Sequence, residues 1–158
     1  MKTFNNSLRT LLFVLGAGVA LMALLPVLTF DDLSYTGYEV AFGMELLNIN
    51  PFNLGSIASA HLPFSLAALL AFTLPFVAGV IALANKRLAL VSLVILITAL
   101  VLMVRLPESV EILTIIGGTE TTVSVDWALG HGLIAATVLT VTAIVAGGVL
   151  VFSEHSNA

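Results

Sequence analysis

Asn85-Lys86-Arg87 decides the fold of this chain, because these three polar residues interrupt an apolar run from Pro63 to Leu106. So short a break leaves room only for the chain to reverse direction. The segments on either side share one plan: an apolar helix, a loop rich in acids and turn residues, a histidine and another apolar helix. The plan predicts an all-α membrane protein, a four-helix bundle with a small β-rich extracytoplasmic cap.

The composition indicates a membrane protein. Hydrophobic residues make up 59% of the 158 residues and charged residues 9%, whereas a soluble globular domain carries roughly 25% charged residues. The absence of cysteine excludes disulfides, thiolate metal sites and cysteine nucleophiles. Five scattered Lys and Arg residues form no basic patch, so no nucleic-acid partner is expected.

Four segments are long and apolar enough to cross ~30 Å of hydrocarbon as helices. The predicted spans are 10–29, 63–84, 88–106 and 127–152, with outer loops 30–62 and 107–126 and an inner turn at 85–87. The first segment also has the basic start and apolar core of a secretory signal peptide. It is long for that role, and no small-x-small site precedes Asp31, so a retained helix is preferred.

Proline and capping signals place the helix ends. Pro63 is expected to open the second helix, where its missing N–H costs nothing. Asp126 is expected to cap the fourth helix, and Trp127 to anchor it at the membrane interface. Pro75 is expected to kink the second helix, and Pro107 to end the third.

The charged residues predict the orientation. Four of the five cations lie at the N-terminus or in the inner turn, and eight of the nine acids lie in the outer loops. Because cytoplasmic loops are enriched in Lys and Arg, both termini are predicted to be cytoplasmic and the protein to be a multi-pass protein of the plasma membrane.

The outer loops contain strand signals. The segment 35–42 has aromatic and β-branched content, with a possible partner strand at 44–49 and turn residues at 50–55. The segment 56–61 is expected to be helical or irregular on the membrane surface. Two β-prone runs, 110–116 and 119–125, flank Gly117-Gly118, which is a strong hairpin signal.

Two histidines are the candidate cofactor ligands. His61 precedes Pro63 by two residues, and His131 stands between Gly130 and Gly132, which leave room for a flat ring such as a tetrapyrrole or for another backbone. The alternative is that both are interfacial polar residues. The outer acids lack the alternating pattern of a calcium loop, so no metal site is predicted.

The predicted helix interiors contain few polar groups. No acid or base lies deep inside a predicted span, which argues against an ion pump. The intramembrane hydroxyls are expected to bond within the bundle; they are Ser92, Thr98, Thr137, Thr140 and Thr142. Small residues at four-residue spacing predict close helix contacts; the pairs are Gly16/Ala20, Ala67/Ala71, Ala78/Ala82 and Ala143/Gly147. The third span has no such pair and is expected to face lipid or a partner subunit.

The order of helices and loops resembles the claudin-type tetraspan layout, although the claudin signature of a Trp, a Gly-Leu-Trp and a Cys pair is absent. The segment from Tyr35 to Gly43 is similar to one in small prokaryotic tetraspan proteins. The resemblance implies that the outer strands join in one sheet, whose edge would bind a partner. The aromatic residues proposed for this partner surface are Tyr35, Tyr38, Phe42 and Trp127.

No catalytic motif is present, so the chain is not predicted to be an enzyme. The leading prediction is a non-catalytic accessory, scaffolding or assembly subunit that binds a larger membrane complex or copies of itself. The first alternative is a haem- or chlorophyll-binding subunit of an electron-transfer or light-harvesting complex, with His131 and His61 as ligands. The second is a passive channel or small-molecule carrier.

Overall fold

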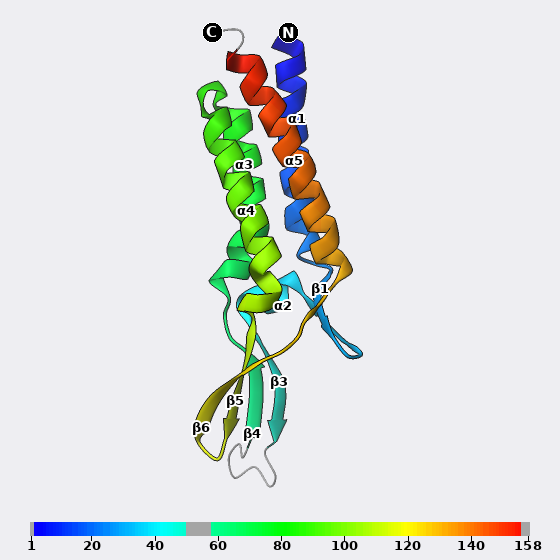
Figure 1. Ribbon diagram of the computed structural model, residues 1–158, viewed down its shortest axis with the longest axis vertical. Helices are drawn as coiled ribbons and strands as arrows, with labels where there is room; N and C mark the ends of the chain where they lie inside the picture. The colour runs from blue at the N-terminus through cyan, green and yellow to red at the C-terminus, as the bar shows by residue number, and fades with distance from the viewer. Residues whose placement is uncertain (1, 50–57, 156–158) are drawn as a thin grey trace.

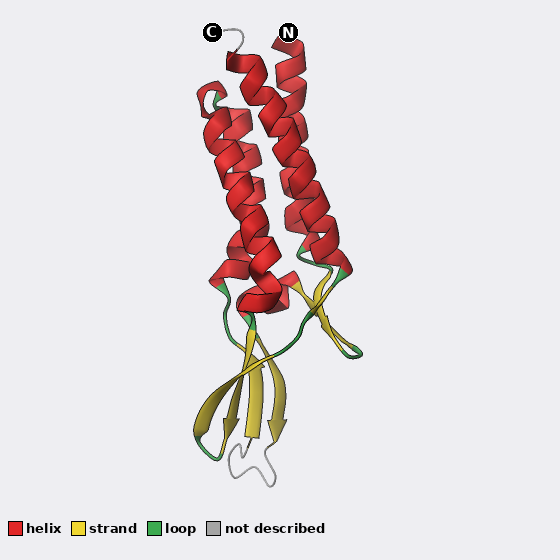
Figure 2. Ribbon diagram, viewed as in Figure 1, coloured by secondary structure: helices red, strands yellow, loops and turns green. Residues whose placement is uncertain are grey.

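The computed structural model describes residues 2–49 and 58–155, which form a bundle of four long helices with two small sheets at one end (Figures 1 and 2). The long helices are α1 (Lys2–Met22), α3 (Leu66–Ala84), α4 (Ala89–Ser109) and α5 (His131–His155). Each is long and apolar enough to cross a membrane. The start of α1, the end of α5 and the turn between α3 and α4, which contains the short helix η2 (Lys86–Leu88), lie at the end away from the sheets (Figure 1).

The four helices form a ring in which each packs against two neighbours. α1 and α4 each contact both α3 and α5. The backbones of α1 and α3 approach each other closely, because a Cβ built on Gly16 would lie 2.3 Å from the Pro75 carbonyl oxygen, and one on Gly79 2.7 Å from Phe13 Cα. Without glycine at these two positions, the backbones would have to move apart.

The first helix lies nearer the N-terminus than the predicted range 10–29. α1 ends at Met22, and the apolar residues that follow form the strand β1 (Pro26–Phe30). Pro26 disfavours helical backbone in the residue before it, and Val27 and Leu28 are fully buried in the core. A continuous apolar run therefore contains both a helix and a buried strand, which hydropathy alone does not separate.

The predicted starts of the second and fourth long helices were wrong by a few residues. α3 begins at Leu66 rather than Pro63, because Ser65 caps it by accepting a hydrogen bond from the Ala68 N–H at 3.2 Å. α5 begins at His131 rather than after Asp126, because Ala128 and Leu129 pair with β1 as the strand β7 (Ala128–Leu129). The Gly130 carbonyl accepts the first hydrogen bonds of α5.

The prediction of a strand over 35–42 was wrong for most of its length. The strand β2 (Leu33–Thr36) ends at Thr36, and the helix α2 (Gly37–Phe42) follows. The Thr36 side chain accepts from the Glu39 N–H, and the Glu39 carboxylate accepts from the Thr36 N–H at 2.8 Å. This capping box starts a helix despite the strand-like composition.

The strands form two antiparallel sheets rather than one. A three-stranded sheet has the order β2-β1-β7, and a four-stranded sheet has the order β3-β4-β5-β6. The strands of the second sheet are β3 (Met44–Ile49), β4 (Ala58–Leu62), β5 (Glu111–Ile116) and β6 (Thr119–Ser124). Its central β4–β5 pair joins the loop before α3 to the loop after α4.

The strands β5, β6 and β4 lie in loop segments whose structure was predicted from the sequence. The hairpin around Gly117-Gly118 is confirmed, and both glycines have positive φ, at 58° and 82°. The segment 56–61 was expected to be helical or irregular, but its described part belongs to β4, held between two partner strands. The turn predicted at 50–55 lies outside the described residues.

Candidate functional site

The four-stranded sheet extends away from the bundle, with its strands running roughly along the long axis of the molecule (Figure 1). We call it the projecting sheet. Residues paired directly across neighbouring strands share a face of a sheet, and successive residues alternate between faces. The register of the three strand pairs therefore assigns the paired side chains to one of two faces, with the exception of Leu46, which lies where the β3–β4 register shifts.

One face carries no ionisable group, and we call it the uncharged face. Its members outside the row nearest the bundle are Leu47, Ile49, Ala58, Ala60, Ile112, Thr114, Ile116, Thr119, Thr121 and Val123. Four of the aliphatic side chains are well exposed: Ile116 at 63%, Leu47 at 52%, Ile49 at 46% and Val123 at 45%. A group of exposed aliphatic side chains on one surface is typical of an interaction site.

The opposite face carries all the ionisable side chains of the described strands in this sheet, and we call it the acidic face. Its members are Glu45, Asn48, Ser59, His61, Glu111, Leu113, Ile115, Glu120, Thr122 and Ser124. His61 is paired with Glu45 on one side and with Leu113 on the other. Charge is thus confined to one face of the sheet, and the other face combines aliphatic side chains with Thr114, Thr119 and Thr121.

The aromatic residues predicted to form a partner surface lie in two different environments. Tyr35 and Trp127 are buried at the junction of bundle and sheets, where their rings meet edge to face at 5.5 Å. The Trp127 Nε1–H donates to the Val110 carbonyl at 2.8 Å. Tyr38 and Phe42, on α2, are 60% and 53% exposed, and their rings lie 4.8 Å apart. Of the four, only this pair is open to a partner.

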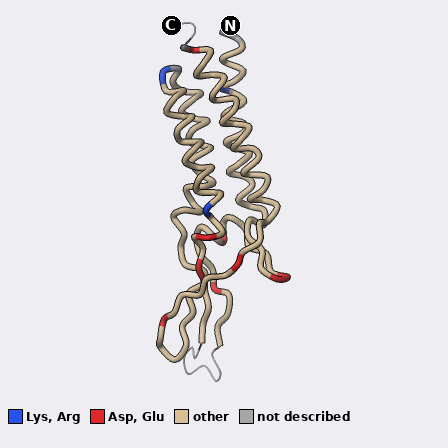
Figure 3. The backbone as a smooth tube through the Cα atoms, viewed as in Figure 1, with Lys and Arg blue, Asp and Glu red and all other residues tan. Residues whose placement is uncertain are grey.

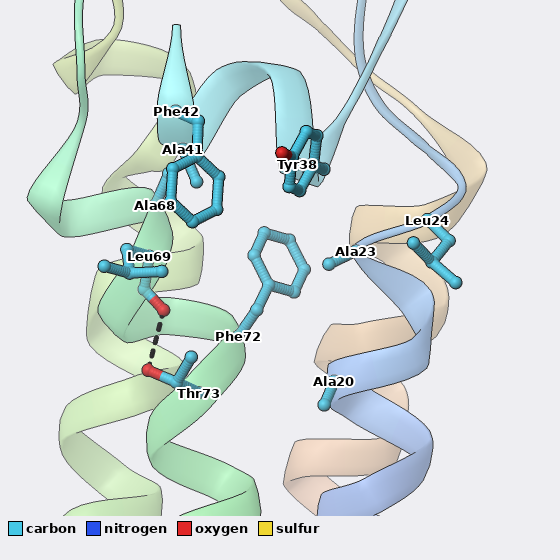
Figure 4. Close-up of a pocket in the computed structure, with 11 residues that line it drawn as sticks. Ala20, Ala23, Leu24, Tyr38, Ala41, Phe42, Ala68, Leu69, Phe72 and Thr73 are labelled. Carbon is cyan, nitrogen blue, oxygen red and sulfur yellow. Dashed lines mark hydrogen bonds between the residues drawn. The ribbon is translucent and has the colours of Figure 1, made fainter.

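A cavity of about 200 Å³ lies under α2, between the sheet end of α1 and the first turns of α3 (Figure 4). Phe72 projects between the two long helices, with Tyr38 and Phe42 at the α2 side (Figure 4). The Thr73 hydroxyl donates to the Leu69 carbonyl at 2.8 Å, so its proton is not available to a ligand in the cavity. Such a lining suits a hydrocarbon group and provides no charge to hold a polar ligand.

The two histidines predicted as cofactor ligands lie on separate elements. His61 is on the acidic face of β4, and His131 is the first residue of α5. The glycines beside His131 face backbone, because a Cβ on Gly130 would lie 2.4 Å from the Pro26 carbonyl oxygen and one on Gly132 2.9 Å from that of Met22. Of the two explanations for these glycines, the structure favours the close approach of another backbone.

An ion pair between Arg9 and Glu154 was not foreseen from the sequence. Arg9 is 4% exposed, and its guanidinium donates to the Glu154 carboxylate across α1 and α5. The Ser153 hydroxyl donates to the Asn5 side chain at 3.0 Å one turn nearer the end. Arg9 was predicted to lie in a polar segment before the first helix. Because α1 begins at Lys2, Arg9 lies inside the bundle instead.

The hydroxyls of the long helices that were predicted to bond within the bundle are satisfied by carbonyls of the same or the adjacent helix. Ser92 donates to the Ala78 carbonyl of the adjacent helix at 2.7 Å. The four threonines each donate to the carbonyl four residues earlier; they are Thr98, Thr137, Thr140 and Thr142. A hydroxyl bonded in this way already donates its proton to a backbone carbonyl, so it is a poor member of a polar path.

No protein-family model, curated protein or solved structure matches the chain.

Proposed function

We propose that this chain is a non-catalytic assembly protein of the cytoplasmic membrane, whose helices anchor the projecting sheet as a docking surface on the extracytoplasmic side. The uncharged face of that sheet is the observation that carries the proposal. Each Å² of apolar surface left in water costs about 25 cal/mol. A partner that covers this face would recover that free energy.

The distribution of charge supports this orientation. Lys86 and Arg87 form the turn at the end of the bundle that also holds the termini, while most acids lie at the end with the sheets (Figure 3). Cationic loops are retained on the cytoplasmic side. The projecting sheet would then stand in the aqueous space outside the membrane, where an uncovered aliphatic face is unfavourable.

The packing of the bundle favours this function over a channel or carrier. Among the described residues, the buried polar side chains are Arg9, Ser92 and Thr140. Arg9 is paired with Glu154, and the two hydroxyls are bonded to backbone carbonyls. A permeation path needs a continuous series of polar groups free to replace water, and three separate buried polar side chains do not provide one.

The proposal is tested by placing a charge on one face of the projecting sheet. Ile116→Glu alters the uncharged face at an exposed position, and Thr122→Glu is the matched control on the acidic face. After crosslinking in intact membranes and gentle solubilisation, electrophoresis should show the wild-type chain and Thr122→Glu in one assembly, and Ile116→Glu in a smaller particle. A wild-type chain that migrates alone, both after solubilisation and after crosslinking in intact membranes, would contradict the proposal.

A further inference from the structure

We infer that the partner of the uncharged face is the same face of a second copy of this chain, so that two projecting sheets pack into a two-layered sandwich. This inference rests on the docking function proposed above and names its partner. The chemistry of the two faces, the direction in which the sheet projects and the shape of the uncharged face support it.

The separation of charge permits self-association despite the acidity of the chain. The net charge is −4, so two copies repel each other unless their acids are kept apart. Glu45, Glu111 and Glu120 all lie on the acidic face, which would point outward in the sandwich. A charged partner of either sign would find no complementary group on the uncharged face.

Insertion in one membrane provides the alignment that the sandwich needs. The strands run roughly along the bundle axis (Figure 1), so two copies inserted in the same direction carry their sheets side by side with nearly aligned strands. Aligned sheets pack face to face at about 10 Å with their strands about 30° apart. A two-fold axis along the membrane normal generates this arrangement from identical faces.

The surface of the uncharged face is stepped rather than flat. In the β3–β4 pair, Leu47 lies opposite Ala60, and Ile49 lies opposite Ala58. Large side chains on β3 thus flank small ones on β4. A two-fold axis along the strands reverses the strand order of the second copy, so the small residues of β4 lie opposite the second copy's β5, which carries Ile112 and Ile116 on this face. Such alternation of large and small side chains allows facing layers to interdigitate.

The size of the face explains why the membrane is needed. Strands ~4.8 Å apart with a rise of ~3.3 Å per residue give this sheet a face of roughly 400 Å², about half of the ~800 Å² that each partner buries in a standard interface. Restriction to one bilayer lowers the translational and rotational entropy lost on association. The dimer is accordingly expected in membranes, and the test keeps the full chain there.

Two single-cysteine variants distinguish the faces, because the natural chain has no cysteine. Ala60→Cys is on the uncharged face, and Ser59→Cys, the adjacent small residue of the same central strand, is on the acidic face. A bismaleimide that bridges thiols about 10 Å apart is added to intact membranes. Ala60→Cys should give a covalent species of twice the chain mass, and Ser59→Cys should remain monomeric. Adding Ile116→Glu to the Ala60→Cys chain should abolish the dimer.

Equal dimer from both cysteines, or dimer from neither, overturns the inference. A photoreactive maleimide on Ala60→Cys then separates the two proposals. An adduct with a different protein would leave the docking function standing with a different partner. A labelled Ala60→Cys chain that forms no adduct with any protein would remove the docking function as well.

Discussion

At the scale of single residues, glycine sets the distance between helices. The sequence pairs Gly16 with Ala20 at four-residue spacing, which predicted close packing, but it does not say which helix approaches. The structure assigns Gly16 to the Pro75 carbonyl. That carbonyl lies in the helix that proline was expected to kink, so proline and glycine act at the same contact.

Gly16→Ala is expected to destabilise the bundle. Its new Cβ would lie 2.3 Å from the Pro75 oxygen, and relieving this contact requires backbone movement, at a cost of about 1–3 kcal/mol. Gly148→Ala is the control, because its Cβ would meet nothing within 4 Å and alanine is the better helix former. Thermal unfolding in detergent should show a lower midpoint for Gly16→Ala and an equal or higher one for Gly148→Ala. A higher midpoint for both would mean that the close approach of α1 and α3 is wrong.

The Arg9–Glu154 pair gives a second prediction at this scale. Glu154→Gln would leave a buried guanidinium without its anion, and breaking a fully buried pair costs about 3–5 kcal/mol. Because the Glu154 side chain is 23% exposed, we expect a smaller loss, about 1–3 kcal/mol after solvent screening. The double variant Arg9→Met/Glu154→Leu should recover most of the stability. Additive losses in the unfolding midpoints of Arg9→Met, Glu154→Leu and their double variant would show that the residues are not coupled.

At the scale of elements, local hydrogen bonding and long-range pairing overrode residue preference. The segment 35–42 has strand-like composition, yet the Thr36–Glu39 capping box makes it helical from Gly37. The described part of 56–61 is Ala- and Ser-rich, yet pairing with β3 and β5 makes it a strand. The capping box was legible in the sequence as Thr-x-x-Glu. The pairing of β4 could not be read from the sequence, because its partners β3 and β5 lie in two different loops.

Thr36→Ala is expected to loosen α2 without unfolding the bundle. The substitution removes the side chain that accepts from the Glu39 N–H, and loss of such a cap costs about 1 kcal/mol. Amide exchange of residues 37–43 should become several-fold faster, most clearly at Gly43, whose N–H donates to the Glu39 carbonyl at 2.8 Å. Thr119→Ala, on the exposed edge strand β6, should leave that exchange unchanged. Unchanged protection in Thr36→Ala would show that α2 does not depend on its cap.

At the scale of the whole molecule, hydropathy predicted the four long apolar helices, and the hairpin signal predicted β5 and β6. The register of that hairpin follows from its two-residue loop, so the faces of β5 and β6 could have been assigned from the sequence. The uncharged face as a whole could not, because β3 and β4 complete it through the pairing of β4 with β5. The candidate site is therefore a product of tertiary pairing rather than of a motif.

The orientation of the molecule in the membrane is the remaining prediction at this scale. Glu120→Cys is placed on the exposed strand β6 of the projecting sheet, and Asn85→Cys is placed in the turn at the opposite end of the bundle. A membrane-impermeant maleimide added to intact cells should label Glu120→Cys at once and Asn85→Cys only after the membrane is permeabilised. The cations at Lys86 and Arg87 are the physical reason, since cationic turns resist translocation. Labelling of Asn85→Cys alone in intact cells would place the projecting sheet in the cytoplasm, and labelling of both would mean that the bundle does not divide the chain between two compartments.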